Sequence, residues 1–313
     1  MRPSLRSSWV GLVVPLVVEP VMGAPYLTIA HALRDFATWP QEARDRWQRE
    51  RLAGVLAHAR EAVPFYRALL GTRGADVRLS DLPVVGKAVI RDRMDEFRSH
   101  DWESIPSIAK RTGGTTGDPW QYPLDKRAWA HVYGAAIAFY EQTGYRYGEP
   151  IVCMGAPPSL HPESVSWKSQ LRLWLEQRSV AAASVTFDAA TSLERALVAS
   201  RIRHGIWYGY ATAFTAMAHA VTEAGVSVRG PKAIVTTSEP LTPVARRTIE
   251  QVFRAPVYDQ YGVYDGGVLA QSCPAGSFHL AENVSIVEIL DGDTPCPPGV
   301  DGDVVVTNLH ART

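Results

Sequence analysis

The stretch "GIWYGYATAFTAMAHAVTEAGVSVRGPKAIVTTSEPLTPVARRTIEQVFRAPVYDQYG", residues 205–262, alternates apolar strand-like runs with amphipathic helix-like runs. "KAIVTTSE" is rich in β-branched residues and predicts a strand. "TPVARRTIEQVF" predicts a helix with Thr242 as its N-cap and Pro243 at its first position, and "ATAFTAMAHAVTEAG" predicts another that Gly225 closes. Strands that alternate with helices of this length predict βαβ units and a mostly parallel sheet.

The rest of the chain falls into three predicted regions. Residues 1–40 are an N-terminal arm, residues 41–270 an α/β core, and residues 271–313 a β-rich segment that is incomplete. Within the core, apolar residues recur at helical spacing before Val63, "VPFYRALLG" predicts a short helix ended by Gly71, and "PIVCMGAP" predicts a strand. At the end, "FHLAENVSIVEIL" and "GDVVVTNLH" predict an antiparallel hairpin or a small barrel-like appendage.

Composition excludes several classes of protein. The chain has 313 residues, 46% of them hydrophobic and 20% charged, which is enough for a sizeable core. Lys plus Arg and Asp plus Glu each number 32, and this balance argues against a general binder of nucleic acids or anionic membranes. Three widely spaced cysteines, Cys153, Cys273 and Cys296, make a disulfide framework unsuitable and favour a reducing cytoplasm.

The N-terminus loosely resembles a signal peptide, because Arg2 and Arg6 precede an apolar run at residues 9–18. Pro15 interrupts that run and Glu19 ends it, and the run is too short to span a bilayer. We therefore interpret residues 1–40 as an irregular apolar arm packed on the domain, with a misplaced start codon as the alternative. We expect no stable membrane insertion.

"RTGGTTGDPW", residues 111–120, has the composition of an oxyanion-binding loop. Its glycines let backbone N–H groups turn inward, and its threonines add hydroxyl donors, which suits the oxygens of a polyphosphate. A P-loop needs Lys directly after the last glycine, but Asp118 stands there. The dinucleotide-binding pattern G-x-G-x-x-G is absent as well. Taken alone, the loop is equally well explained as a turn without a ligand.

Six ordered segments together resemble the adenylate-forming enzymes. The loop is similar to their phosphate-binding pattern [ST]-[SG]-G-[ST]-T-G-x-P. "LAHAREAVPFYRALL" and "LPVVGKAVIRDRMDEF" resemble the N-terminal region of phenylacetate–CoA ligase-type proteins, a branch that includes ligases named for capsule biosynthesis. "YGYATAFTAMAHAV" resembles a segment of that branch, with Ala211 where proline is usual. "TTSEPLTP", "DQYGVYDGG" and "CPAGSFHLAENVSIVEIL" complete the match, which runs from about residue 40 to the end.

The resemblance implies a fold, a reaction and a set of nucleotide-binding residues. The fold is the large N-terminal domain of an adenylate-forming enzyme. The reaction converts a carboxylic acid and ATP, with Mg²⁺, into an acyl-adenylate, whose acyl group then passes to coenzyme A. The residues implied for the phosphates are Thr112, Gly113, Gly114, Thr115, Thr116 and Gly117; Ser238, Glu239 and Pro240 would line the adenine site with their backbone, and Tyr261, followed by Gly262, would stack on the base. Trp120 stands where many relatives have lysine, which this branch commonly lacks.

The resemblance also gives Asp265 and Thr112 catalytic roles. Asp265 stands where the family has a glutamate that contacts Mg²⁺. Aspartate offers the same hard oxygen ligands, but its side chain is one methylene shorter, so direct and water-mediated contacts with the metal both stay open.

Other residues have an unremarkable alternative beside the functional one. The aromatic residues Tyr208, Tyr210 and Phe214 suit an acyl pocket, although such aromatic runs are more often core. Cys273 and His279 are two of the ligands that zinc would need, and a structural role is favoured for them. His131 is expected to be packing.

In this family, the strand matched by "GDVVVTNLHART" leads into an Arg-Tyr-x-x-Gly-Asp segment, a hinge and a C-terminal lid domain that carries the adenylation lysine. None of these parts lies within residues 1–313 by motif. We therefore expect an acid–thiol ligase that is truncated and impaired, which acts on a small carboxylic acid, without nucleic acid, and as a possible homodimer. The alternative is a non-catalytic remnant that binds a nucleotide or a protein partner.

Overall fold

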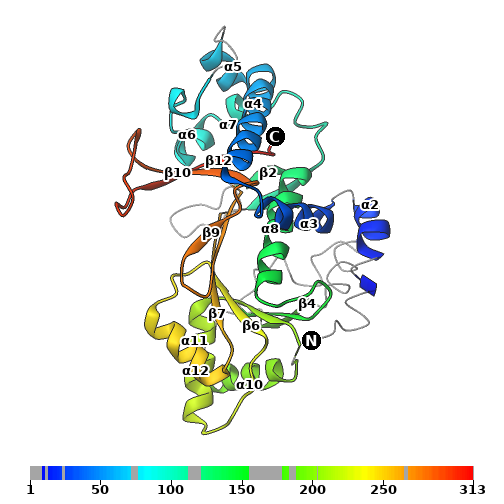
Figure 1. The fold of residues 1–313 in the computed structure, drawn as a ribbon, viewed down its shortest axis with the longest axis vertical. Helices are drawn as coiled ribbons and strands as arrows, with labels where there is room; N and C mark the ends of the chain where they lie inside the picture. Colours follow the sequence, from blue (N-terminus) through cyan, green and yellow to red (C-terminus); the bar gives the residue numbers. More distant parts are fainter. Residues whose placement is uncertain are drawn as a thin grey trace. The chain divides into compact units, whose positions relative to one another are not determined.

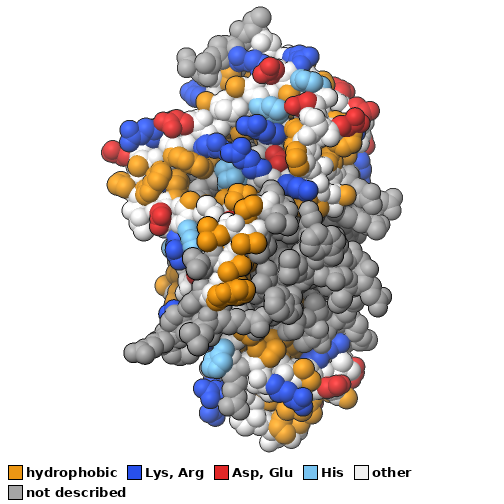
Figure 2. Space-filling view, turned by 90° about the vertical axis from the view of Figure 1, so that its right-hand side faces the viewer, with side chains coloured by type: hydrophobic (Ala, Val, Ile, Leu, Met, Phe, Trp, Pro, Cys, Tyr) orange, Lys and Arg blue, Asp and Glu red, His pale blue; other side chains and the backbone are white. Residues whose placement is uncertain are grey.

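The structure is a computed structural model that describes residues 9–10, 13–22, 25–71, 77–111, 121–154, 178–182, 188–202, 204–263 and 267–312. The chain forms two compact units, each assembled from three separate stretches. The first unit comprises Met1–Leu27, Ala136–Gly262 and Leu269–Leu280, and the second comprises Thr28–Ala135, Val263–Val268 and Ala281–Thr313. Acidic and basic side chains are interspersed on the face drawn in Figure 2, in keeping with the net charge of zero.

The helices and strands follow one another along the chain as Figure 1 labels them. The helical segments are η1 (Val14–Val18), α2 (Glu19–Met22), α3 (Tyr26–Phe36), α4 (Gln41–Ala62), α5 (Pro64–Leu70), η2 (Leu79–Asp81), α6 (Lys87–Asp92), α7 (Met94–Phe97), α8 (Lys126–Gln142), α10 (Ala189–Ser200), α11 (Ala211–Glu223) and α12 (Pro243–Phe253). The strands are β1 (Ser107–Arg111), β2 (Gln121–Asp125), β3 (Ile151–Met154), β4 (Arg178–Ala182), β5 (Ile206–Gly209), β6 (Ala233–Thr237), β7 (Val257–Val263), β8 (Val268–Ser272), β9 (Phe278–Leu280), β10 (Ser285–Asp291), β11 (Thr294–Pro295) and β12 (Asp303–Asn308). Among the described residues, no helix has the length and apolar character that crossing a membrane requires.

The main sheet has seven strands in the order β4-β3-β5-β6-β7-β8-β9. The pairs β4–β3, β3–β5, β5–β6 and β6–β7 are parallel, and β8–β9 is antiparallel. Helices α11 and α12 connect β5 to β6 and β6 to β7. The predicted α/β class with a mostly parallel sheet is therefore confirmed.

Successive residues of the central strands point into two different cores, as the two-residue period of a strand requires. Val152, Trp207 and Ile234 face a core that they share with residues of α10, α11 and α12. Their strand neighbours, which include Ile151 and Val235, face a second core with Tyr140 at the end of α8. Both faces of the sheet are covered, which explains why these strands are apolar throughout.

The helix ends follow the signals in the sequence. The Thr242 hydroxyl accepts a hydrogen bond from the Ala245 N–H at 3.1 Å, and Pro243 is the first residue of α12. Gly71 has φ 44° at the end of α5, and Gly225 has φ 64° after α11. These are backbone conformations that glycine adopts without strain, so each glycine can end its helix.

The N-terminal arm is not irregular, and this expectation was wrong. Residues Tyr26–Phe36 form the 11-residue helix α3. Its buried face consists of Tyr26, Leu27, Ala30, Leu33 and Phe36, whose spacing is the helical period that the sequence interpretation overlooked.

The β-rich end is built from β10, β11 and β12, which pair antiparallel in one three-stranded sheet. The predicted single stretch at residues 278–290 is divided into two strands. The Val284 N–H donates to the Ala281 carbonyl at 2.8 Å, and the resulting turn separates β9, which joins the main sheet, from β10, which does not.

His131 of α8 and His310 stack in the second unit. Their ring centroids are 3.4 Å apart and the interplanar angle is 14°. His310 Nε2 lies 2.7 Å from the Asn283 carbonyl, and its Nδ1 lies 3.0 Å from Arg51 Nη2. Nε2 therefore donates, while Nδ1 accepts from the guanidinium, so the neutral ring satisfies both neighbours.

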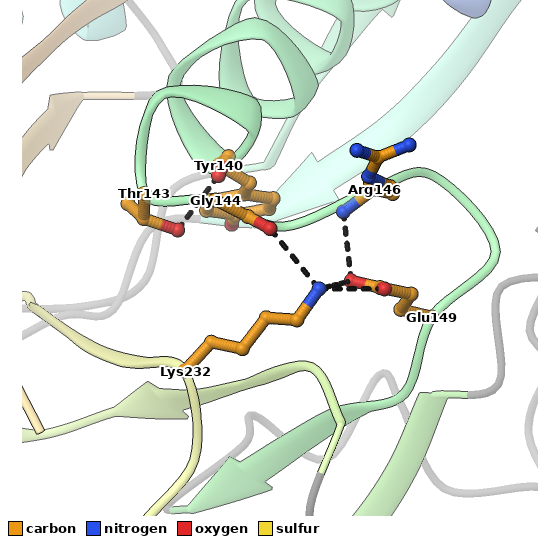
Figure 3. Close-up of polar contacts among 6 residues, drawn as sticks. All are labelled: Tyr140, Thr143, Gly144, Arg146, Glu149 and Lys232. Atoms are coloured by element: carbon orange, nitrogen blue, oxygen red, sulfur yellow. Dashed lines mark hydrogen bonds and ion pairs between the residues drawn. The ribbon is translucent and has the colours of Figure 1, made fainter. Parts of the chain in front are cut away.

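Lys232 and Glu149 form a buried ion pair at the amino-terminal edge of the main sheet (Figure 3). Lys232 Nζ lies 2.6 Å from each oxygen of Glu149 and donates to the Gly144 carbonyl at 3.1 Å. The Arg146 N–H adds a bond to Glu149 Oε2 at 2.9 Å. Because every donor of the ammonium has an acceptor, this cluster joins the segment before β6 to the segment before β3.

Candidate functional site

Three parallel strands of the first unit end side by side. The register places Gly209 of β5 opposite Thr236 of β6, and Thr237 of β6 opposite Gln260 of β7. The residues that follow these positions lie along the carboxyl edge of the sheet, which is where open α/β sheets bind ligands. Tyr210, Ser238 and Tyr261 are among them, so the structure brings together three segments that the sequence analysis assigned to one site.

Close contact between strands fixes the first of these turns. A Cβ on Gly209 would lie 1.9 Å from the Met154 carbonyl oxygen, so only glycine allows β5 to approach β3 this closely here. Tyr210 follows as the residue before α11, and its partly buried ring packs against the core beneath α11.

The second turn, at Ser238, Glu239 and Pro240, leaves β6 with an unusual backbone. Ser238 has φ 66°, the left-handed region that residues other than glycine seldom adopt. Such strain is frequent at functional sites. The Glu239 carboxylate turns back to α11, where Oε2 accepts from the Thr212 N–H at 3.0 Å and from the Thr212 hydroxyl at 2.7 Å.

Tyr261 and Gly262 end the third strand at this edge. The side chain of Tyr261 is 45% exposed although the residue belongs to β7. An aromatic ring that stands in solvent at a strand end offers a flat apolar face to a planar ligand.

The sequence analysis missed Asp259, a half-buried carboxyl group two residues before Tyr261. Its Oδ1 accepts a hydrogen bond from the Thr236 hydroxyl at 2.9 Å. Burial raises the pKa of Asp259, against the opposing effects of the Thr236 bond and of Arg246. A perturbed carboxyl at a ligand-binding edge is a candidate functional group, and its place beside Tyr261 in the sequence was the available signal.

The aromatic residues proposed for an acyl pocket lie in different environments. Phe214 is fully buried and stacks on Trp207 at 6.4 Å between centroids, so the structure places it in the core. Tyr208 is partly buried and meets the edge of Tyr140 at 5.8 Å. Of the three, Tyr208 and Tyr210 keep some exposed surface.

The phosphate loop and the expected metal ligand lie outside the described residues. These positions are Thr112, Gly113, Gly114, Thr115, Thr116 and Gly117 of the loop, and Asp265. The described strands β1 and β2 flank residues 112–120 and pair antiparallel, with Arg111 opposite Gln121.

Cys273 and His279 lie at a hairpin between β8 and β9. A hydrogen bond from His279 lowers the pKa of the Cys273 thiol. Within the part of the chain that the structure describes, no cluster of three or more His, Cys, Asp or Glu side chains is arranged to hold a metal ion.

Solved structures of 2-hydroxyisobutyryl-CoA ligase share this fold. An open conformation in complex with 2-HIB-AMP and CoA matches at 21% identity and TM-score 0.69, over 88% of this chain and 68% of that one. The thioesterification state of the same ligase matches at 22% identity and TM-score 0.70, over 88% of this chain and 62% of that one. The chain thus spans about two thirds of the length of these ligases. No protein-family profile and no curated protein matches it.

The likeness confirms the fold expected from the resemblance to adenylate-forming enzymes. The identities are low, so the shared property is the fold of these CoA ligases over most of this chain.

Proposed function

We propose that this chain is the nucleotide-binding part of an acid–thiol ligase that activates a carboxylic acid with ATP. In the first step a carboxylate oxygen attacks the α-phosphorus of ATP, and pyrophosphate leaves. In the second step the thiol of coenzyme A attacks the acyl carbonyl, and AMP leaves. The observation that carries the proposal is the alignment of Tyr210, Ser238 and Tyr261 at one sheet edge, in a fold shared with a CoA ligase.

The parts of the site have different proposed tasks. The backbone of Ser238–Pro240 and the ring of Tyr261 would hold the adenine, because they meet at the carboxyl edge of β6 and β7. Residues 112–117 would cradle the phosphates with N–H and hydroxyl donors. Asp265 would hold Mg²⁺, which neutralises charge on the phosphates when it is bound.

The finer assignment follows the sequence resemblance. We propose a phenylacetate–CoA ligase-like enzyme of the branch that includes capsule-biosynthesis ligases, located in the cytoplasm, with a small carboxylic acid as its substrate. Whether adenylation proceeds within these 313 residues is a separate question from nucleotide binding.

Titration calorimetry with ATP and AMP tests the proposal. Stacking on an aromatic side chain contributes about 1–3 kcal/mol, so Tyr261→Ala is expected to weaken nucleotide affinity on the order of tenfold. Phe278→Ala is the matched control, because Phe278 of the same unit is similarly exposed, at 49% against 45%. Absence of nucleotide affinity in the wild type, or an equal loss in both variants, would refute the proposed site.

Carboxylate-dependent exchange of pyrophosphate into ATP tests the chemistry separately. Exchange by the chain supports a complete adenylation site. Nucleotide binding without exchange with any acid supports the alternative, in which the chain binds a nucleotide without turnover.

A further inference from the structure

Two turns at the carboxyl edge of the main sheet are joined by one carboxylate. Glu239 lies in the turn after β6, and Thr212 lies in the first turn of α11, which follows β5. Glu239 Oε2 accepts both the Thr212 N–H, at 3.0 Å, and the Thr212 hydroxyl, at 2.7 Å. The two residues are 27 positions apart, so the contact is tertiary and not local.

This carboxylate replaces the cap that α11 lacks in its own sequence. The residue at the N-cap position, Tyr210, makes no side-chain capping bond. The first N–H groups of a helix have no acceptor within the helix, and the helix dipole favours a negative charge at that end. Glu239 supplies both the acceptor and the charge from the neighbouring turn.

The same contact constrains a strained backbone. Ser238, directly before Glu239, has φ 66°, which is unfavourable for a residue with a Cβ. On the other side of the turn, Leu241 packs against the core under α11. Ser238 is thus held between a strand and a residue whose side chain and successor are both anchored to α11 and its core.

We infer that Glu239 is a positioning residue that holds the Ser238–Pro240 backbone in its nucleotide-binding conformation through Thr212. This inference rests on the proposed function. Its carboxylate serves α11 and does not act as a ligand of a metal ion or a ligand amine. Since one oxygen accepts two donors, part of the negative charge is also compensated next to the proposed site of an anionic nucleotide.

A double-mutant cycle read as AMP affinity in EDTA tests the inference without metal. Glu239→Ala is expected to weaken AMP binding about tenfold, and Glu239→Gln to recover most of that loss because its amide oxygen still accepts. Thr212→Val is expected to weaken binding less, since its N–H remains. The double variant should bind no more weakly than Glu239→Ala alone. Glu223→Ala, at the exposed far end of the same helix, is the control.

The results separate the inference from its premise. Equal AMP affinity of wild type and Glu239→Ala, or additive losses in the cycle, would overturn the inference alone. A loss that appears with ATP and Mg²⁺ but not with AMP in EDTA would also overturn it, because that pattern belongs to a metal ligand. If the wild type binds no nucleotide, the proposed function falls and the inference falls with it. Should Glu239→Ala fail to fold, the Thr212→Val and Glu239→Gln variants carry the same comparison.

Discussion

The stacked pair His131 and His310 makes the stability of the protein depend on pH. Burial lowers the pKa of His131 from 6.5 to about 4 and that of His310 from 6.5 to about 3. Nearby cations, among them Arg51 and Arg127, act in the same direction. Well above pH 6.5 both histidines are neutral in the folded and the unfolded chain, so their contribution to stability is fully present. As the pH falls from 6.5 towards 4, the unfolded chain binds protons that the folded protein does not, and the free energy of unfolding decreases.

The size of this effect follows from the two pKa values. Each histidine lowers the free energy of unfolding by about 2 kcal/mol between pH 7 and pH 5, so the pair accounts for roughly 4 kcal/mol. That loss is a large share of the 5–15 kcal/mol that is typical of folded proteins. The raised pKa of Asp259 works in the opposite direction.

His131→Phe isolates one half of the effect. Phenylalanine keeps a ring to stack on His310 but cannot bind a proton, so the loss between pH 7 and pH 5 should be about 2 kcal/mol smaller than in the wild type. Asp259 is present in both proteins and cancels from the comparison. The measurement is urea unfolding by circular dichroism at both pH values with linear extrapolation. His219→Gln, at an exposed position of α11, is the control and should follow the wild type. The reasoning is wrong if His131→Phe loses as much stability on acidification as the wild type.

Three further substitutions test the packing and the backbone by chemical unfolding. Lys232→Met leaves the buried carboxylate of Glu149 without its cation and should cost about 3–5 kcal/mol, most of which Glu149→Leu in the same chain should restore; additive losses would contradict the ion pair. Arg254→Gly removes a side chain from a left-handed residue at the end of α12, with φ 52°, and should raise stability by up to about 1 kcal/mol; a decrease would show that the arginine is not strained. Gly205→Ala places a Cβ 1.9 Å from the Pro150 carbonyl oxygen at φ 123°, and a cost below about 2 kcal/mol would mean that the strands separate easily there.

Local signals in the sequence predicted much of the fold. Thr242, Pro243 and Gly225 each act on backbone groups within a few residues, so their effect on the neighbouring helix can be read without knowledge of the tertiary structure. The alternation of strands and helices then restricts the sheet to a mostly parallel topology. Helix α3 was missed because the signal-peptide-like composition before it drew attention away from the spacing of its apolar residues.

The tertiary contacts of the site could not be predicted in the same way. Glu239 was assigned to the site for its backbone, while its side chain caps a helix 27 residues away. Asp259 looks like an ordinary strand residue until its burial beside Thr236 is known. The partners of His310 include Arg51, which is 259 positions distant in the sequence. Such pairs depend on which strands become neighbours, and no local pattern encodes that.

The interleaved composition of the two units bears on how the chain is made. The second unit begins with Thr28–Ala135 but needs Ala281–Thr313 to be complete, and the first needs Leu269–Leu280 beside segments made much earlier. Because synthesis proceeds from the N-terminus, neither unit has all of its parts until most of the chain has left the ribosome. Early segments such as α4 must therefore wait with their apolar faces uncovered, and fragments cut at a single point would divide both units.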